Sequence, residues 1–294
     1  MTVRPRRSVL YMPGSNARAL EKAKTLVADT LILDLEDAVA PSAKAEARTQ
    51  VCAAVKAGGY GKRELVIRIN SLESDWSAAD LVAAAKAGPD AILVPKVSRP
   101  DDIEAVSKAL DKAGASDTMR IWAMMETPLG MLNAKRIARA AKKYPRFEAM
   151  VMGTNDLAKE TGTSLGYQRF AMLSWLMTCV AAARAYGLVI IDGVWNDFKD
   201  EAGCKVECDQ GRLMGMDGKT LIHPGQIAAA NEAFAPSAEE VAAAKDIIAA
   251  FELPENKGLG AINLNGRMVE LLHCEMAHKT VAMHEAIMAL EQGA

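Results

Sequence analysis

The sequence predicts an α/β fold, a (β/α)₈ barrel of the TIM type followed by a C-terminal helical extension. Eight short apolar runs rich in β-branched residues recur along the chain, and they are continuous rather than alternating. Such runs are typical of parallel strands that are covered on both faces. Segments rich in Ala, Lys and Glu lie between them and end at Gly or Pro, as helices do. Eight strand–helix pairs in about 220 residues fit one barrel. A doubly wound open sheet is the alternative that strand spacing does not exclude.

The expected strands come in a regular order. From the N-terminus they are SVLYM from residue 8, TLILDL from 30, ELVIRI from 64, AILVPK from 91, RIWAMM from 120, AMVMGT from 149, LVIIDG from 188 and KTLIHP from 219. Helical spacing between them is clearest in ALEKAKTLVA, AADLVAAAKAG and NAKRIARAAKKYP. We therefore expect residues 1–235 to form the catalytic barrel domain.

Residues 236–294 are expected to form the helical extension. Ser237 and the acidic residues after it predict a capped helix. A Gly- and Asn-rich stretch, NKGLGAINLNGRM, then indicates a loop or short hairpin, and a final amphipathic helix follows it. The segment is too short for a second domain with its own core. We expect it to pack on a neighbouring subunit, and packing on its own barrel is the alternative.

Composition and charge narrow the class of protein. The net charge is −2, so nothing favours nucleic acid as a partner. No run of eighteen apolar residues and no signal-peptide core are present, so we expect no membrane partner and a cytoplasmic location. Five cysteines without a signal peptide indicate reduced thiols. Cys204 and Cys208 are four residues apart, but no second Cys/His pair accompanies them, so no zinc site is expected.

Polar side chains gather at the C-terminal ends of the expected strands, where barrels of this kind place their working residues. These side chains are Asp34, Glu36, Asp37, Arg68, Asn70, Lys96, Glu126, Asn155, Asp156, Asp192 and His223. We expect them to face one mouth of the barrel. For Asp192 and His223, a turn and a strand-end cap are the alternatives.

Glu126 and Asp156 are the expected metal ligands. Each follows the end of an apolar run, and the two runs are adjacent in the strand order. Carboxylate oxygens without a Cys or His cluster suit Mg²⁺, which keeps several waters and takes one or two protein carboxylates. Mn²⁺ is the substitute ion that we consider. The alternative is that each acid only caps the helix that follows it.

Arg68 lies inside an apolar run, so it is expected in the barrel or at its rim. A buried arginine needs acids to pair with, and Glu36 and Asp37 on the adjacent strand can supply them. The functional interpretation is a fixed cation that polarises a substrate oxygen on which negative charge develops. The alternative is a purely structural ion-pair network.

Two further stretches predict anion binding. Arg18 and Lys22 lie four residues apart on a helix that follows a tight turn, a combination that suits a phosphate. A solvated helix face is the alternative there. In the stretch VMGTNDLAKE, the backbone N–H groups of Gly153, Thr154 and Asn155 could hold a substrate carboxylate beside the metal.

Together these motifs resemble the citrate lyase β-subunit-like group of the HpcH/HpaI aldolase superfamily, which includes malyl-CoA and citramalyl-CoA lyases. The stretches that carry the resemblance run from residue 7 to about residue 231: RSVLYMPGSNARALEKA, LILDLEDAVAPSAKAEAR, VIRIN, ILVPKV, METPLG, MGTNDL and GMDGKTLIHPGQI. The set is specific, although no single stretch is.

The resemblance implies a Mg²⁺-dependent lyase that cleaves a 3-hydroxyacyl-CoA of the malyl-, methylmalyl- or citramalyl-CoA type. The products would be a 2-oxoacid and acetyl- or propionyl-CoA, so an acyl-CoA and a 2-oxoacid would be the partners, with CoA as part of the substrate. It also implies a homotrimer or homohexamer. By position, Arg68 would stabilise the enolate, and Glu36 and Asp37 would hold metal waters and Arg68. Arg18 and Lys22 would contact the CoA phosphates.

The chain departs from the family pattern near its C-terminus. Members of the family often have Gly-Lys-Met-Val/Ile-Asp there, with an Asp that reaches a neighbouring subunit's site as the carbon acid. This chain has Glu270 at that position, one methylene longer. We keep Glu270 as the expected acid. Three alternatives stay open. One is a thioesterase that hydrolyses malyl-CoA-type substrates, and another is a pyruvate-type class II aldolase without CoA, which Arg18 and Lys22 disfavour. The third is a non-catalytic acyl-CoA-binding protein, which the change to Glu270 favours and the intact Glu126, Asp156 and Arg68 disfavour.

Overall fold

The eight predicted strands close into a parallel barrel. The computed structural model of the protein describes residues 3–293, apart from the side chain of Tyr167, and its strands follow one another in chain order around the barrel until the eighth pairs with the first. The predicted (β/α)₈ fold is therefore confirmed, and the open doubly wound sheet is excluded. The strands are β1 Ser8–Pro13, β2 Thr30–Asp34, β3 Glu64–Arg68, β4 Ala91–Val94, β5 Arg120–Met125, β6 Phe147–Met152, β7 Val189–Asp192 and β8 Gly218–Leu221.

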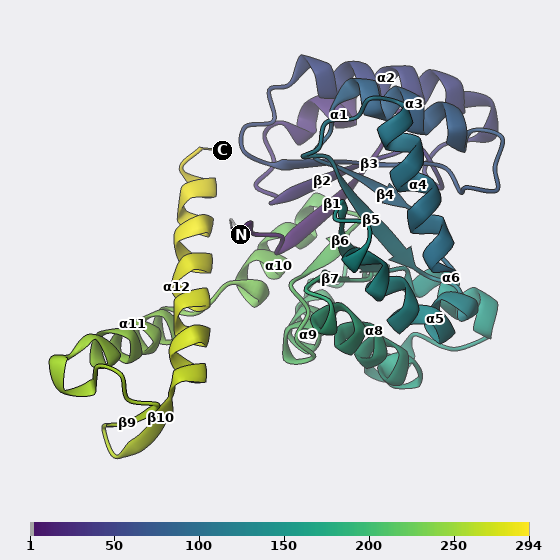
Figure 1. Cartoon of the computed structure of the whole chain (residues 1–294). Helices are drawn as coiled ribbons and strands as arrows, with labels where there is room; N and C mark the ends of the chain where they lie inside the picture. The colour runs from purple at the N-terminus through teal and green to yellow at the C-terminus, as the bar shows by residue number, and fades with distance from the viewer. Residues whose placement is uncertain (1–2, 294) are drawn as a thin grey trace. The chain divides into compact units, whose positions relative to one another are not determined.

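Helices follow the strands and surround the barrel (Figure 1). They are α1 Ala17–Ala23, α2 Lys44–Ala57, α3 Ser77–Ala87, α4 Pro100–Lys112, α5 Pro128–Arg139, α6 Thr154–Thr161, α7 Gly166–Arg169, α8 Leu173–Ala185, α9 Glu201–Leu213 and α10 Ile227–Phe234. Among residues 3–293, none of the helices combines the length and apolarity that crossing a membrane requires.

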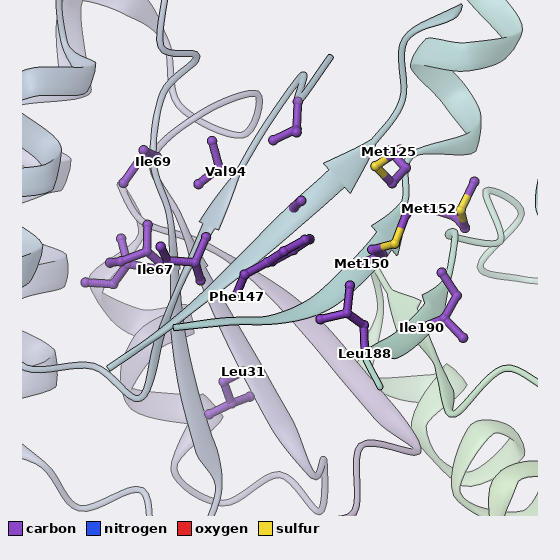
Figure 2. Close-up of a cluster of buried hydrophobic side chains, with 14 of the residues drawn as sticks. Leu31, Ile67, Ile69, Val94, Met125, Phe147, Met150, Met152, Leu188 and Ile190 are labelled. Atoms are coloured by element: carbon purple, nitrogen blue, oxygen red, sulfur yellow. The ribbon is translucent and has the colours of Figure 1, made fainter. Parts of the chain in front are cut away.

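Two buried layers fill the structure, because successive strand side chains point to opposite faces. One set points outward and packs beneath the helices; Figure 2 shows part of it, including Ile67, Met125, Met150 and Ile190. The other set fills the inside of the barrel and includes Val9, Ile32, Val66, Leu93, Trp122, Met124, Val151 and Ile191. This alternation decides which polar residues can reach the mouth.

The strand register brings specific polar residues together. Asp34 and Arg68 are the last residues of β2 and β3 and pair directly across the two strands. They lie two residues beyond Ile32 and Val66, which belong to the interior layer. Asp34 and Arg68 therefore continue the inward face at the C-terminal end of the barrel.

The N-terminal end of the barrel carries buried ion pairs of its own. Arg6, just before β1, donates to both carboxylate oxygens of Glu64 at 2.6 and 2.7 Å and to Glu148 at 2.8 Å. Arg7 makes a similar two-nitrogen contact with Asp29, at 2.9 Å for both nitrogens. These charges join the first strand to its neighbours at the bottom of the barrel.

Among the described residues, 235–293 and 3–5 form a separate compact unit. It contains α11 Ala238–Glu252, a β-hairpin of β9 Ala261–Leu264 and β10 Arg267–Glu270, and α12 Leu271–Glu291. Ser237 caps α11, as predicted: its hydroxyl accepts from the backbone N–H of Glu240. The sequence analysis expected no core of its own in this segment, but three residues do form a small buried cluster, Ala250, Ile262 and Val269.

Candidate active site

Arg68 is held rigidly at the C-terminal end of the barrel. Its Nε and Nη2 donate to the two carboxylate oxygens of Asp34 at 2.6 Å each. Its remaining nitrogen, Nη1, lies 3.0 Å from Glu36 Oε2 and 3.4 Å from Asp37 Oδ2. Glu36 and Asp37 do pair with Arg68, as the sequence analysis expected, but the bidentate partner is Asp34. The guanidinium also lies over the ring of Tyr11, 4.8 Å from its centroid.

The charges around Arg68 set its ionisation and that of its partner. Burial alone lowers the pKa of Arg68, but Asp34 and Tyr11 raise it well above its ordinary value. Burial likewise raises the pKa of Asp34, but the guanidinium of Arg68 outweighs burial and holds it below its ordinary value. Both groups therefore stay charged at neutral pH, as a buried pair with good geometry requires.

Glu36 and Lys96 form a second pair beside Arg68. The ammonium of Lys96 donates to Glu36 Oε1 at 3.1 Å, and the carboxyl of Glu36 is buried. Burial raises the pKa of Glu36, and the charges of Arg68 and Lys96 only partly offset it. Glu36 is thus a carboxyl of raised pKa between two cations.

Glu126 follows β5 and is almost completely buried. Its Oε1 accepts a hydrogen bond from the backbone N–H of Lys96 at 2.7 Å, whereas its Oε2 has no hydrogen-bond partner within residues 3–293. Burial, with a contribution from Glu36 and Asp156, raises the pKa of Glu126 to about 8. Burying a carboxylate oxygen without a hydrogen-bond partner costs folding free energy, so we expect this oxygen to bind a ligand.

Gly153 makes room for Glu126. A Cβ built at residue 153 would lie 2.4 Å from the Cβ and 2.5 Å from the Oε2 of Glu126, so only glycine fits there. Gly153 precedes α6, and Asp156 lies half-buried in the first turn of that helix. The charge of Asp156 contributes to the raised pKa of Glu126.

The donor set around Glu126 fits a hard divalent cation. Two carboxylates with an unpartnered oxygen match the one or two protein carboxylates that Mg²⁺ usually takes. Within residues 3–293, no group of three or more His, Cys, Asp or Glu side chains is arranged to hold a metal ion. Any ion between Glu126 and Asp156 would therefore depend on water and substrate for its other ligands.

The other residues of the stretch after β6 have different positions. Thr154 is buried and packs against the backbone at Gly193, where a Cβ would lie 2.5 Å from the threonine hydroxyl oxygen. Asn155 is exposed and exchanges two side-chain hydrogen bonds with Asn196, at 2.9 and 2.7 Å. Asn155 therefore lies at the rim, and the loop after β7 is its neighbour.

Arg18 and Lys22 lie on α1, with both side chains exposed. Their helix begins at Asn16, whose side chain accepts from the backbone N–H of Ala19 at 3.0 Å. The turn before the helix is tight, because a Cβ at Gly14 would lie 2.3 Å from the carbonyl oxygen of Asp34. The two cations are thus available to a phosphate on the outside of the barrel end.

Two of the expected mouth residues are engaged elsewhere. Asp192 follows the inward-facing Ile191 and so points outward, where Arg169 at 2.6 Å and Lys219 at 3.1 Å neutralise it in a fully buried cluster. The expectation that it faces the mouth was wrong, because strand alternation puts it on the opposite face. Asn70 is also buried, and its side chain donates to Asp80 of α3 at 2.7 Å.

His223 acts as a strand-end cap, the alternative that the sequence left open. Its Nδ1 accepts from the backbone N–H of Gly225 at 3.1 Å at the start of a short 3₁₀ helix, Pro224–Gln226. Its ring stacks on Phe198 with the centroids 5.2 Å apart.

Glu270 lies in the C-terminal unit, at the junction of β10 and α12. It is the N-cap residue of α12, without a side-chain cap hydrogen bond among the described residues, and its backbone N–H donates to His273 Nδ1 at 3.0 Å. The carboxylate that the sequence analysis expected as a carbon acid thus lies at the start of a helix in the C-terminal unit.

Sequence reasoning missed three contributors to the site: the bidentate role of Asp34, the ring of Tyr11 and the contacts of Lys96. Counting every second residue from Ile32 and Val66 would have assigned Asp34 and Arg68 to one inward face. No comparable pattern indicates the turn at Lys96.

A model of the HpcH/HpaI aldolase/citrate lyase family matches residues 7–224, so the chain belongs to this family. The chain is 51% identical over 285 residues to a (3S)-malyl-CoA thioesterase of Cereibacter sphaeroides, covering 97% of this chain and 96% of that protein. It is 34% identical to an L-malyl-CoA/beta-methylmalyl-CoA lyase of the same species, again over 97% and 96% of the two chains.

Solved structures agree with this assignment. The protein CitE from Mycobacterium tuberculosis, in complex with magnesium, acetoacetate and coenzyme A, superimposes with a TM-score of 0.74. Its sequence is 27% identical, and the match covers 96% of this chain and 99% of that one. The citrate lyase β subunit of the same species, with oxaloacetate and magnesium, matches with a TM-score of 0.67 at 26% identity, over 80% of this chain and 100% of that one. The resemblance found in the sequence is confirmed.

Proposed function

We propose that this protein is a Mg²⁺-dependent thioesterase that hydrolyses a malyl-CoA-type thioester to malate and free CoA. The 51% identity to a (3S)-malyl-CoA thioesterase, over nearly the full length of both chains, carries the proposal. The carbon–carbon lyase that the sequence analysis placed first becomes the second candidate. It keeps that place because a malyl-CoA lyase matches over the same length, although at 34% identity.

The geometry at the C-terminal end of the barrel suits either reaction. Glu126 and Asp156 are the residues that would hold the ion, since Glu126 Oε2 is buried and has no hydrogen-bond partner among the described residues. When bound, Mg²⁺ supplies a Lewis acid for the oxygens of the hydroxy-acid end of the substrate. Mn²⁺ remains a proposed substitute. Arg68, held by both oxygens of Asp34, supplies a fixed positive charge beside the pair.

In the proposed hydrolysis, water attacks the thioester carbon. The water oxygen forms the new carbon–oxygen bond, and the carbon–sulfur bond breaks with its electron pair on sulfur. Glu36 takes the proton that the water loses and passes it to the departing CoA sulfur. Burial raises the pKa of Glu36 above its ordinary value, which makes it a stronger base than an exposed carboxylate. Asp37, which is more exposed, assists by holding Arg68 and water.

Glu270 supports hydrolysis over cleavage of a carbon–carbon bond. A lyase needs an acid that protonates the enolate carbon, whereas hydrolysis of a thioester needs none. In this chain the candidate acid is the N-cap residue of α12 and is one methylene longer than the family's aspartate. A displacement of that order can lower a rate by about 10²-fold.

We propose that Arg18 and Lys22 contact the phosphates of CoA. Both side chains are exposed at the start of the barrel mouth, on the helix that follows β1. We also propose that the backbone N–H groups of Thr154 and Asn155 receive the substrate carboxylate, since they open α6 next to Glu126. The backbone N–H of Gly153, which the sequence analysis included, instead donates to the carbonyl oxygen of Met125 at 3.1 Å.

We further propose a cytoplasmic homo-oligomer, a trimer or hexamer, in which the C-terminal unit packs on a neighbouring subunit. Exposed apolar side chains on the hairpin and α12 support an interface: Met268, Leu271, Leu272 and Met276 are each at least half exposed. Light scattering coupled to size-exclusion chromatography tests the subunit number, and a monomer would contradict the assembly.

A product assay tests the reaction. The purified protein is incubated with (3S)-malyl-CoA, with Mg²⁺ or with EDTA, and the products are followed by mass spectrometry. We expect free CoA and malate only when Mg²⁺ is present. Glu36→Gln serves as a variant that keeps the shape of the carboxyl but cannot take a proton.

The other outcomes are equally informative. Acetyl-CoA with glyoxylate would establish the lyase and displace the thioesterase. Turnover that is unchanged in EDTA would remove the metal from the proposal. Binding of malyl-CoA without any product would favour the non-catalytic acyl-CoA-binding protein.

A further inference from the structure

Lys96 has an uncommon backbone conformation. It follows β4 in the left-handed region, with a φ of 56°. Glycine adopts this region without steric cost, whereas a lysine does not. Non-glycine residues held there gather at functional sites. The turn directs both polar groups of Lys96 into the site: the backbone N–H to Glu126 at 2.7 Å and the ammonium to Glu36 at 3.1 Å.

Lys96 differs from the other two cations around Glu36. Arg68 is only 8% exposed at its side chain and is bound by both oxygens of Asp34. Lys44 is buried and donates to two backbone carbonyl groups after β2. The side chain of Lys96 is 38% exposed, and within residues 3–293 one oxygen of Glu36 is its only acceptor. Since an ammonium has three donors, two remain for a ligand.

The charge around Lys96 favours an anionic ligand once a divalent ion is bound. The cluster around Glu36 and Glu126 has two more carboxylates than cations: Asp34, Glu36, Asp37, Glu126 and Asp156 against Lys44, Arg68 and Lys96. A doubly charged ion cancels that excess. An incoming anion then meets the exposed ammonium of Lys96 without net repulsion.

We infer that the ammonium of Lys96 binds an anionic oxygen of the small-acid part of the substrate, beside Glu126 and Asp156. Lys96 follows β4, between Arg68 on β3 and Glu126 after β5, so an acid held at the proposed metal pair lies next to it. The inference rests on the proposed function for its substrate class, a CoA ester whose acyl part carries a carboxylate. Lys96 would select such esters over those with an apolar acyl chain.

Calorimetry with pyruvate, the smallest stable 2-oxo acid, tests the inference without any turnover. Pyruvate is titrated into the full chain at saturating Mg²⁺, and Mg²⁺ binding is measured separately. Lys96→Met removes the charge and keeps the length, Lys96→Gly also relieves the backbone, and Lys96→Arg keeps the charge. We expect Lys96→Met and Lys96→Gly to bind Mg²⁺ but to weaken pyruvate binding about tenfold or more, as loss of a charged hydrogen bond does. Lys96→Arg should bind more tightly than Lys96→Met.

A control variant and three outcomes decide how the result is interpreted. Lys86→Met removes an exposed lysine on α3 and should leave pyruvate affinity unchanged. Wild-type affinity in Lys96→Met or in Lys96→Gly overturns the inference, and so does a wild-type protein that does not bind pyruvate. Binding of pyruvate through Lys96 by a protein that releases no CoA from malyl-CoA would instead keep the inference and remove the proposed function.

Discussion

The two ends of the barrel both bury charge, but they leave it in different states. At the N-terminal end, Arg6 is bound by both oxygens of Glu64 and by Glu148. At the C-terminal end, Arg68 is bound equally well by Asp34, yet Glu126 keeps one buried oxygen without a partner within residues 3–293. Charged groups whose hydrogen bonds are all made within the protein hold the strands together. A carboxylate with an unpaired oxygen, next to a fully paired cation, can still bind a ligand. This contrast matches the division of barrels into a stabilising and a catalytic end.

Glu126→Gln tests the difference between the two ends most directly. It should lower kcat/KM about 10³-fold. The amide keeps the shape but cannot serve as an anionic metal ligand. The free energy of unfolding should not fall, because the wild-type carboxyl is buried and its Oε2 finds no hydrogen-bond partner in residues 3–293. Steady-state kinetics and chemical denaturation measure the two effects. Near wild-type turnover would remove Glu126 from the metal site.

The pH dependence of stability tests the buried carboxyl of Glu126 in a second way. The pKa of Glu126 is raised to about 8, from an ordinary value of 4.5, so the folded state holds a proton that the unfolded state releases. The protonated carboxyl contributes its full stabilisation at a pH below the pKa of the unfolded state. That contribution is lost as the pH rises toward the pKa of the folded state. In EDTA, raising the pH from about 5 to about 8 should therefore lower the melting temperature of the wild type relative to that of Glu126→Gln, whose side chain does not titrate. A constant difference would contradict the raised pKa.

Arg68→Lys should lower kcat by about 10²-fold. A single ammonium cannot make the two hydrogen bonds to Asp34 and still face Glu36. The split between kcat and KM decides the role of Arg68. A change in KM alone would show that Arg68 binds substrate without stabilising charge that develops during the reaction.

The matched substitution at the N-terminal end, Glu64→Gln, should have the opposite consequence for stability. It removes the fully buried anion of Arg6 and leaves the more exposed Glu148 as a partner, so it should cost unfolding free energy at the lower end of about 3–5 kcal/mol. The turnover of the folded fraction should stay at the wild-type value, since the proposed site lies at the other end of the strands. Denaturation and activity are measured on one preparation. A stable but inactive Glu64→Gln would contradict the division between the two ends.

The sequence was sufficient for most of the fold and for the composition of the site. Continuous apolar runs separated by helical spacing predicted all eight strands, because parallel barrel strands are buried on both faces. Strand ends also indicated Arg68 and Glu126, since polar residues there are rare without a reason. Asp192 was placed wrongly because its direction depends on where the alternation starts, which an all-apolar strand does not reveal. The left-handed turn at Lys96 depends on tertiary contacts with Glu126 and Glu36.

Glu270→Gln should have the smallest effect. If the protein hydrolyses its substrate, no carbon acid is needed, so the rate of CoA release should match wild type. Glu270 is the N-cap residue of α12 without a side-chain cap hydrogen bond among the described residues, so the loss of stability should stay within about 1 kcal/mol. Glu270→Ala is the companion variant, which removes the carboxylate and should also leave the rate of CoA release unchanged. A fall of about 10²-fold in the formation of acetyl-CoA and glyoxylate in Glu270→Gln, with stability unchanged, would restore Glu270 as the acid and with it the lyase.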